Sequence, residues 1–197
     1  SPAYFLYSHY VILLFTNNQP EIKSLDKYAV IGNPVSHSKS PQIHASFAEQ
    51  TGAALEYGAI LAERDKFRET AERFFAADGK GANVTVPFKE EAFKLVNSLS
   101  TEASKAGAVN TLSLDAEGKL CGHNTDGIGL VTDIKTNHGG SLTNKSILVL
   151  GAGGAARGIL QPFLDENPAL ICIANRTVSK AESLAELYRD AGDISAC

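Results

Sequence analysis

The chain has 197 residues, of which 44% are hydrophobic and 20% are charged, and its formal net charge is −4. This composition is typical of a globular protein, and the length allows one large or two small domains with a proper core. A negative net charge without a basic stripe argues against a nucleic-acid partner.

Cysteine and histidine usage limits the chemistry further. The three cysteines, Cys121, Cys172 and Cys197, are odd in number and widely spaced. They predict neither a zinc pattern nor a disulfide framework, and they favour a cytoplasmic protein in a reducing compartment. The five histidines show no ligand spacing, so we expect no metal.

The N-terminal region is unusual. The chain contains no Met, not even at position 1, which indicates a fragment or a processed chain. Residues 3–15 are apolar and aromatic, but this run is too short to span a bilayer and lacks the basic region of a signal peptide. We therefore expect no membrane partner and regard residues 1–27 as an extension of uncertain role.

The first predicted elements are a strand and a helix. Residues 28–31 form an apolar run that ends at the turn 32–34. The pair Ser40-Pro41 predicts a helix start, with Ser40 as N-cap and Pro41 at the first helical position. Gly52 is expected to end this helix.

A second strand, a helix and a third strand follow. Residues 55–60 predict the second strand. Apolar residues at helical spacing over 67–75 predict a helix, with Asp65 as its cap. Residues 82–86 predict the third strand, which Pro87 closes.

The middle of the chain predicts two helices around a hairpin. A short helix is expected over 89–97, and residues 109–114 and 119–122 predict the hairpin. Another helix starts near residue 124 and runs to about 135. The turn-rich segment 137–141 is the predicted domain boundary.

The last segment carries the most informative pattern of the chain. An apolar strand over 146–150 leads directly into the glycine-rich turn 151–158 and a helix. A second apolar strand over 170–174 ends in Asn175-Arg176-Thr177. This β-α-β-α order is typical of the first half of a Rossmann unit. Its small residues let the backbone approach a pyrophosphate, and its helix N-terminus offers free N–H groups.

Polar clusters mark the predicted strand and helix ends of the first region. They lie at 36–41, 83–89, 106–111 and 124–127, and they supply hydroxyls, an amide, an ammonium and a carboxylate. Ligands of open α/β sheets bind outside the carboxyl ends of strands, so these clusters could line one cleft. The set suits a small polyol acid as substrate.

Six motifs in this order together resemble the shikimate dehydrogenase family, which includes shikimate/quinate dehydrogenases. They are Gly32 to Pro41, Asn83 to Lys89, Ala106 to Leu112, Asn124 to Gly127, Gly151 to Ala155, and Asn175 to Thr177. Each is weak alone, but six in order are highly specific. The resemblance implies reversible, NADPH-dependent reduction of 3-dehydroshikimate to shikimate in aromatic amino-acid biosynthesis.

The resemblance also implies an α/β fold with two domains that flank a cleft. We expect a substrate-binding and catalytic domain with a mixed sheet over residues 28–137. A Rossmann-type NADP-binding domain would occupy residues 138–197 and would be truncated at its C-terminus, because members of the family continue well beyond this point. Half a Rossmann sheet would leave an exposed strand edge and an apolar face.

The resemblance assigns substrate and catalytic roles to six residues. Ser38 and Ser40 would hold the substrate carboxylate. The residues around its ring hydroxyls would be Thr85, Lys89, Asn110 and Asp126. Lys89 and Asp126 would be the catalytic pair, and the chemistry agrees: hydride arriving at a carbonyl carbon leaves negative charge on oxygen, which a cation or proton donor must stabilise.

Nine residues are the predicted cofactor contacts: Gly151, Ala152, Gly153, Gly154, Ala155, Asn175, Arg176, Thr177 and Lys180. NAD enzymes commonly place Asp or Glu after the second strand, to accept a hydrogen bond from the ribose. Here that position has two cations, Arg176 and Lys180, and no carboxylate, which favours a 2′-phosphate and therefore NADP.

Several assignments have a purely structural alternative. Ser40 and Asp126 could be helix caps alone, Asn110 could satisfy a local backbone group, and Lys89 or the Arg176–Lys180 pair could be solvated surface charges. The histidines at 37, 44 and 123 are expected to be structural.

Three functions stay open for the chain, which we expect to be a monomer or a homodimer. The first is an NADP-dependent shikimate dehydrogenase. The second is a quinate/shikimate dehydrogenase of broader specificity. The third is a non-catalytic truncated fragment that only binds the polyol acid.

Overall fold

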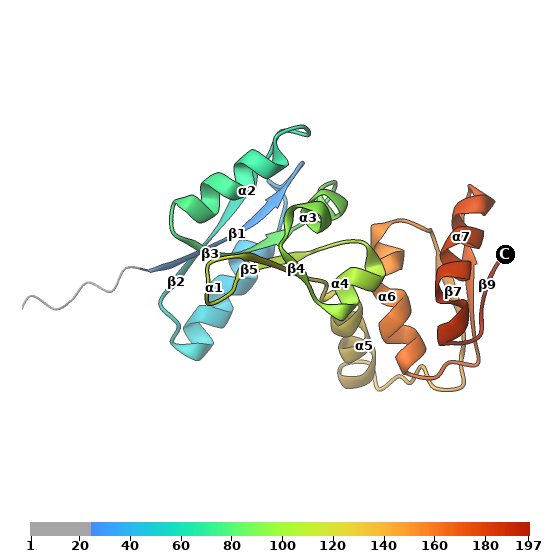
Figure 1. Cartoon of the computed structure of the whole chain (residues 1–197). Helices are drawn as coiled ribbons and strands as arrows, with labels where there is room; N and C mark the ends of the chain where they lie inside the picture. The colour runs from blue at the N-terminus through green and yellow to red at the C-terminus, as the bar shows by residue number, and fades with distance from the viewer. Residues whose placement is uncertain (1–24) are drawn as a thin grey trace, which may run out of the picture.

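The computed structural model describes residues 25–197, so the predictions for residues 1–24 lie outside it. Within the described residues, the strands form one sheet of six and one of three, and helices α4, α5 and α6 lie between the two sheets (Figure 1). The elements of the first sheet and its helices are β1 (Asp26–Gly32), α1 (Ser40–Thr51), β2 (Leu55–Leu61), α2 (Phe67–Ala76), β3 (Gly79–Val84), α3 (Lys89–Leu95), β4 (Ser98–Leu99), α4 (Thr101–Ala106), β5 (Thr111–Leu114), β6 (Leu120–His123) and α5 (Asp126–Thr136). The second sheet and its helices comprise β7 (Ser146–Leu150), α6 (Gly154–Asp165), β8 (Leu170–Ala174), α7 (Val178–Tyr188), the 3-10 turn Arg189–Ala191 and β9 (Ile194–Ala196).

The six-stranded sheet is mixed, as predicted. Its order is β2-β1-β3-β5-β6-β4. Strand β1 pairs in parallel with β2 and β3, β5 pairs antiparallel with β3 and β6, and β4 is parallel to β6. Strands β1, β3 and β6 therefore point the same way, and β5 points the opposite way. This arrangement brings three strand carboxyl ends and one strand amino end to the same edge.

The two faces of this sheet differ in polarity. Helices α2 and α3 cover one face, where Ile31, Val84 and Leu112 pack against the stacked rings of Phe67 and Phe88. Helix α1 lies on the opposite face (Figure 1). Because side chains alternate along a strand, apolar residues on the first face leave polar and aromatic residues on the α1 side.

The three-stranded sheet is entirely parallel, in the order β7-β8-β9. Helix α6 packs Leu160 against Ile171 and Ile173 of β8, and all three are fully buried. Strand β7 is an edge of the described sheet, and its Leu148 and Leu150 are 60% and 79% exposed. Among the described residues, this sheet therefore has an exposed strand edge and exposed apolar side chains, as expected.

Three predictions in this part of the analysis were wrong or incomplete. Ser40 is the first residue of α1 rather than its N-cap, which is Lys39, and the N-cap of α2 is Lys66 rather than Asp65. Cys172 and Cys197 form a disulfide, although the sequence predicted no disulfide framework. Their spacing carried no signal because β9, which brings Cys197 beside β8, was not predicted.

Helix α5 connects the two sheets and crosses α6 at very close range. A Cβ atom added at Gly127 would collide with the carbonyl oxygen of Gly158, so the two backbones touch without intervening side chains. No helix among the described residues is long and apolar enough to cross a membrane. The division of the chain into domains at residue 137 stays a prediction.

Candidate active site

Four polar segments meet at one edge of the six-stranded sheet. The loop that follows β1 carries Ser38 and leads to Ser40, the first residue of α1. Thr85 follows β3, Asp126 follows β6, and Asn110 precedes the oppositely directed β5. The strand directions bring these segments together from positions up to 88 residues apart, counted from Ser38 to Asp126. The sequence prediction that strand ends converge on one site agrees with this arrangement.

Lys89 and Asp126 form an ion pair at this edge. The Nζ of Lys89 lies 2.5 Å from Oδ2 of Asp126, and their side chains are 20% and 29% exposed. Each is the first residue of a helix, Lys89 of α3 and Asp126 of α5. A carboxylate is favoured at a helix N-terminus and an ammonium is disfavoured there, so Asp126 offsets an otherwise poor position for Lys89.

Asn110 is one of two buried polar residues among those described, and only 8% of it is exposed. Its backbone bridges two strand ends, because its N–H donates to the carbonyl of His123 and its carbonyl accepts from the N–H of Val84. Its side-chain Nδ2 donates to Oδ1 of Asp126 at 2.7 Å. Both carboxylate oxygens of Asp126 therefore have a defined partner, Lys89 on one and Asn110 on the other.

The two serines lie together at the start of α1. The hydroxyl of Ser38 donates to that of Ser40 at 3.2 Å. The Tyr57 side chain, from β2, stands beside Ser40: burial raises the pKa of Tyr57 to about 12, while a hydrogen bond with Ser40 lowers it. Thr85 sits next to the end of β1, where a Cβ at Gly32 would collide with its methyl group.

Sequence reasoning assigned no individual role to three residues of this site, namely Tyr57, Asn83 and Thr111. The Tyr57 hydroxyl donates to Oδ1 of Asn83 at 2.6 Å, and Nδ2 of Asn83 donates to the Thr111 hydroxyl at 3.2 Å. Asn83 and Thr111 are directly opposite each other in the β3–β5 register. A signal was present, because Asn83 and Thr111 lie within the polar clusters 83–89 and 106–111, but their pairing depended on an unknown register.

Two of the histidines considered above, His44 and His123, have local partners. The His44 ring stacks on the Tyr57 ring with 3.9 Å between centroids, and its Nδ1 lies 2.9 Å from the Ser40 carbonyl oxygen. His123 Nε2 lies 3.2 Å from the Ser113 hydroxyl. The structural role of the histidines at 37, 44 and 123 stays a prediction.

The glycine-rich turn lies at the carboxyl edge of the three-stranded sheet. Gly151 has φ +115°, a conformation that favours glycine, and its N–H donates to the Ala174 carbonyl at 2.7 Å. Gly153 is the N-cap of α6, and Ala152 is buried. Among the described residues, no atom lies within 4 Å of a Cβ built at the glycines 151, 153 and 154, so these positions are open to a ligand.

The segment after β8 lies beside this turn. Because β7 and β8 are parallel with Leu150 opposite Ala174, residues 151 and 175 are at neighbouring strand ends. The Asn175 side chain donates to the carbonyl of Thr177, which is the N-cap of α7. On the neighbouring helix, Ala155 lies in the first turn of α6. Arg176 and Lys180 are exposed near the start of α7. The open turn, the α6 N-terminus and these two cations fit a nucleotide with an additional phosphate.

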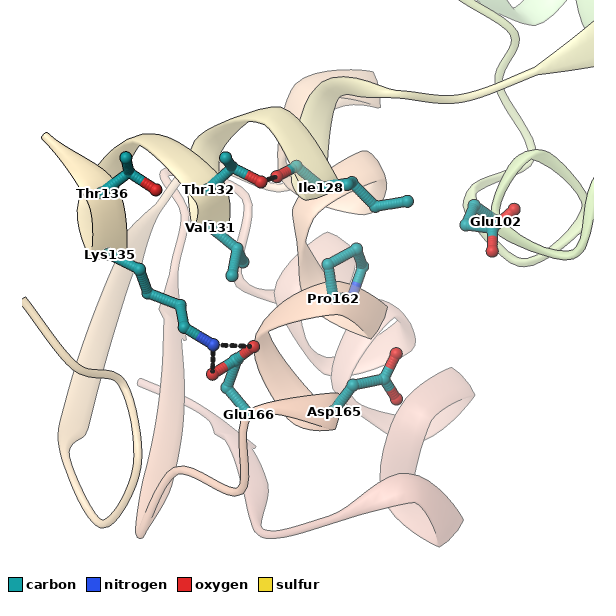
Figure 2. A pocket seen from close by; sticks show the side chains of 9 residues that line it. All are labelled: Glu102, Ile128, Val131, Thr132, Lys135, Thr136, Pro162, Asp165 and Glu166. Atoms are coloured by element: carbon teal, nitrogen blue, oxygen red, sulfur yellow. Dashed lines mark hydrogen bonds and ion pairs between the residues drawn. The ribbon is translucent and has the colours of Figure 1, made fainter.

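A separate hollow lies between α5 and α6, and it contains no predicted site residue. Figure 2 shows Val131 and Pro162 on its floor and the Lys135–Glu166 ion pair at one end, where Nζ lies 3.0 Å from both carboxylate oxygens. The volume of this hollow is about 350 Å³. It marks the helix contact between the two sheets rather than the polar strand-end site.

The mixed sheet with polar strand ends and the attached glycine-rich βαβ unit define an α/β protein of the Rossmann-containing, two-sheet class. Two family models match the chain: the shikimate dehydrogenase substrate binding domain over residues 30–112, and shikimate / quinate 5-dehydrogenase over residues 133–195. The chain belongs to the shikimate dehydrogenase family. The resemblance inferred from the six motifs is thus confirmed.

Individual relatives agree with the family models. The chain is 59% identical over 172 residues to shikimate dehydrogenase (NADP(+)) of Hahella chejuensis. It superimposes with a TM-score of 0.82 and 44% identity on an Ael1 enzyme from Pseudomonas putida. It also superimposes, with a TM-score of 0.79 and 34% identity, on shikimate 5-dehydrogenase from Thermus thermophilus in complex with NADP(H) and shikimate.

These alignments include most of this chain but less of the relatives. They cover 87% of the chain and 63% of the Hahella relative, 87% and 63% for the Pseudomonas structure, and 88% and 63% for the Thermus structure. The chain therefore spans less than two thirds of the length of the relatives that it matches.

Proposed function

We propose that the protein is an NADP-dependent shikimate dehydrogenase that reversibly reduces 3-dehydroshikimate to shikimate in aromatic amino-acid biosynthesis. The observation that carries this proposal is the Lys89–Asp126 pair beside Asn110 at the strand ends, in a chain that also has an open glycine-rich turn. The name of the Hahella relative and the ligands of the Thermus structure support the same activity.

Lys89 and Asp126 are the proposed catalytic pair. Bound NADPH supplies the hydride that reduces the substrate carbonyl. The Lys89 ammonium lies where it can stabilise the negative charge that develops on the carbonyl oxygen, and it can donate the proton that completes the alcohol. Asp126 orients the ammonium through the 2.5 Å contact and can accept a hydrogen bond from a neighbouring substrate hydroxyl. In the reverse direction, the same pair accepts the proton.

The remaining substrate contacts follow from the residue chemistry. Ser38 and Ser40 offer two adjacent hydroxyls for the substrate carboxylate, and Thr85 and Asn110 face the ring hydroxyls in this proposal. Asn110 already has partners on both ends of its amide. One of them, the exposed Thr125 hydroxyl at 3.0 Å from Nδ2, occupies the position that a substrate hydroxyl could take.

The proposed cofactor contacts are the turn 151–155 for the pyrophosphate and the segment 175–180 for the 2′-phosphate. The N–H groups at the start of α6 favour an anion. Arg176 and Lys180 supply positive charge near the adjacent strand end, without a carboxylate in the segment 175–180. In this proposal, residues 28–137 form the substrate domain and residues 138–197 belong to the NADP domain.

The test is the growth of nicotinamide absorbance when shikimate and NADP⁺ are supplied to this protein. We expect reduced cofactor to accumulate, and we expect Lys89→Ala to lower turnover by about 100-fold or more while shikimate binding by calorimetry changes much less. Lys105→Ala, which removes an exposed lysine of α4, is the control and should retain activity. Near-normal turnover in Lys89→Ala would exclude Lys89 as the acid/base group.

Two alternatives have distinct outcomes in this assay. A family model that describes both shikimate and quinate dehydrogenases supports the broader enzyme, which would turn over quinate at a rate comparable to shikimate. Shikimate binding without turnover would support the fragment that only binds the acid. The cytoplasmic location and the monomeric or homodimeric state stay predictions.

A further inference from the structure

A continuous line of hydrogen bonds runs behind the proposed catalytic pair, from β2 across β3 and β5 to the start of α5. The Tyr57 hydroxyl donates to Asn83 Oδ1 at 2.6 Å, and Asn83 Nδ2 donates to Thr111 Oγ1 at 3.2 Å. The Thr111 hydroxyl then donates to Asn110 Oδ1 at 2.9 Å, and Asn110 Nδ2 donates to Asp126 Oδ1 at 2.7 Å. The line ends on the carboxylate that also holds Lys89.

The direction of each donor in this line is fixed by its neighbour. A threonine hydroxyl has one proton and two lone pairs. Because Thr111 Oγ1 accepts from the Asn83 amide, its own proton is free to point at Asn110 Oδ1. Nδ2 of Asn83 also donates to the Asn110 backbone carbonyl at 3.4 Å, which can only accept. This contact places Nδ2 of Asn83 toward β5 and its Oδ1 toward the Tyr57 hydroxyl. Hydrogen bonds that all run in one direction strengthen one another.

The amide of Asn110 is the point at which this line acts on the carboxylate. Its Oδ1 accepts from the Thr111 hydroxyl and from the backbone N–H of Thr125 at 3.1 Å. These two donors together require that Nδ2, and not Oδ1, faces Asp126. Without the hydroxyl of Thr111, only Thr125 would hold the Oδ1 end of the buried amide, through its backbone N–H and its exposed hydroxyl at 3.3 Å. That hydroxyl also accepts from Nδ2, so it fits either orientation of the amide.

We propose that Thr111 is a positioning residue for the reaction, and that it acts by locking the Asn110 amide so that Nδ2 is directed at Asp126. Tyr57 and Asn83 orient the Thr111 hydroxyl from behind. This inference rests on the proposed function, since Asp126 matters to turnover only if the Lys89–Asp126 pair is catalytic. The geometry of the line itself does not depend on that function.

The test compares Thr111→Val, which removes the hydroxyl and keeps the shape, with Thr111→Ser, which keeps the hydroxyl. Thr132→Val is the matched control, because the Thr132 hydroxyl donates to the Ile128 carbonyl in α5, away from Asp126. The first measurement needs no substrate or cofactor. It is the solvent exchange rate of the Asn110 side-chain amide protons, followed by NMR in the ligand-free protein.

We expect the Asn110 amide protons to exchange roughly fivefold faster or more in Thr111→Val than in wild type, and to be unchanged in Thr111→Ser and Thr132→Val. Equal exchange in Thr111→Val and wild type would overturn the proposal, whatever the activity of the protein. A general loss of folding would accelerate backbone amides throughout the molecule, so a change restricted to Asn110 separates positioning from destabilisation.

The second measurement is steady-state turnover of shikimate with NADP⁺. We expect kcat to fall about tenfold in Thr111→Val with KM changed by less than about twofold, and Thr111→Ser to recover most of the rate. An unchanged kcat in Thr111→Val, in an active protein, would also overturn the proposal. If wild type has no turnover, the proposed function fails, while the exchange measurement still decides whether Thr111 locks Asn110.

Discussion

Lys89 Nζ lies 2.5 Å from Asp126 Oδ2, although the two residues are 37 positions apart and begin two different helices. The contact exists because β3 and β6 both run toward the same edge, with β5 antiparallel between them. Helix α3 starts a few residues after β3, and α5 starts a few residues after β6. The sheet topology therefore creates the pair, and the side chains complete it.

We predict that Asp126→Asn lowers turnover of shikimate about 100-fold or more while leaving the fold intact. The amide keeps the size of the carboxylate but cannot hold the Lys89 ammonium by charge or accept as strongly from a substrate hydroxyl. Both side chains are partly exposed, so the loss of the ion pair should cost little stability. The measurements are kcat and the urea midpoint of the same preparation.

Asp133→Asn provides the control for that experiment, since Asp133 lies on the same helix and contacts only the exposed Asn137 and His138 among the pairs described. It should leave kcat unchanged. If Asp126→Asn retained wild-type turnover, the role assigned to the ion pair would be wrong.

We predict that Gly127→Ala and Gly129→Ala have opposite effects on stability, although both lie on α5. A Cβ at residue 127 would collide with the backbone of α6 and approach Pro162 Cγ to 2.7 Å, whereas no described atom lies within 4 Å of a Cβ at residue 129. Overpacking should lower the free energy of unfolding by about 1–3 kcal/mol for Gly127→Ala. Alanine at residue 129 should raise it by about 0.5–1 kcal/mol, because glycine is the poorer helix former.

Urea denaturation of the two variants checks this prediction directly. Equal stability of both variants would mean that α5 can move away from α6 without cost, and that the close helix crossing is not a constraint on the position of Asp126.

The titration of Tyr57 predicts a loss of stability at alkaline pH. Burial raises the pKa of Tyr57 in the folded protein to about 12, above the value of about 10 for an unfolded tyrosine. As the pH rises from about 10 to about 12, the unfolded state loses its phenolic proton first and is stabilised relative to the folded state. The contribution of Tyr57 is fully present below about pH 10 and is lost as the pH rises through about 12.

Tyr57→Phe isolates this contribution from other alkaline groups. We expect the wild-type protein to be more stable than the variant at neutral pH, by about 1 kcal/mol for the hydrogen bond to Asn83. The difference should shrink between about pH 10 and about pH 12 in urea denaturation curves. A difference that stays constant over this range would contradict the prediction.

The elements that the sequence predicts well are those whose signal is local. The strands over 146–150 and 170–174 are confirmed at both ends, because each is a largely apolar run that stops at a glycine or polar residue, Gly151 or Asn175. The convergence of Lys89, Asn110 and Asp126 is also predictable, since it follows from strand direction and from the position of polar residues at strand ends.

The features that sequence reasoning missed depend on partners far away in the chain. Strand β4 has two residues, and β9 has three, and such short strands exist only because β6 and β8 offer them a paired edge. The line through Tyr57, Asn83 and Thr111 depends on the register of β3 against β5. A one-residue shift of that register would move these side chains to the other face, and no local pattern fixes it.

The last prediction concerns cofactor choice: Arg176→Ala should weaken NADPH binding about tenfold or more and leave NADH binding nearly unchanged. Arg176 lies two residues after the end of β8, beside the glycine-rich turn, and its exposed guanidinium can pair with a 2′-phosphate that NADH lacks. Arg189→Ala is the control, because Arg189 is an exposed arginine near the end of α7 that pairs with Glu186. Dissociation constants for both cofactors come from quenching or enhancement of nicotinamide fluorescence. An equal loss of affinity for NADPH and NADH would mean that Arg176 supports the fold of the turn rather than recognition of the 2′-phosphate. Lys180 would then be the remaining cation of this segment that could account for a preference for NADP.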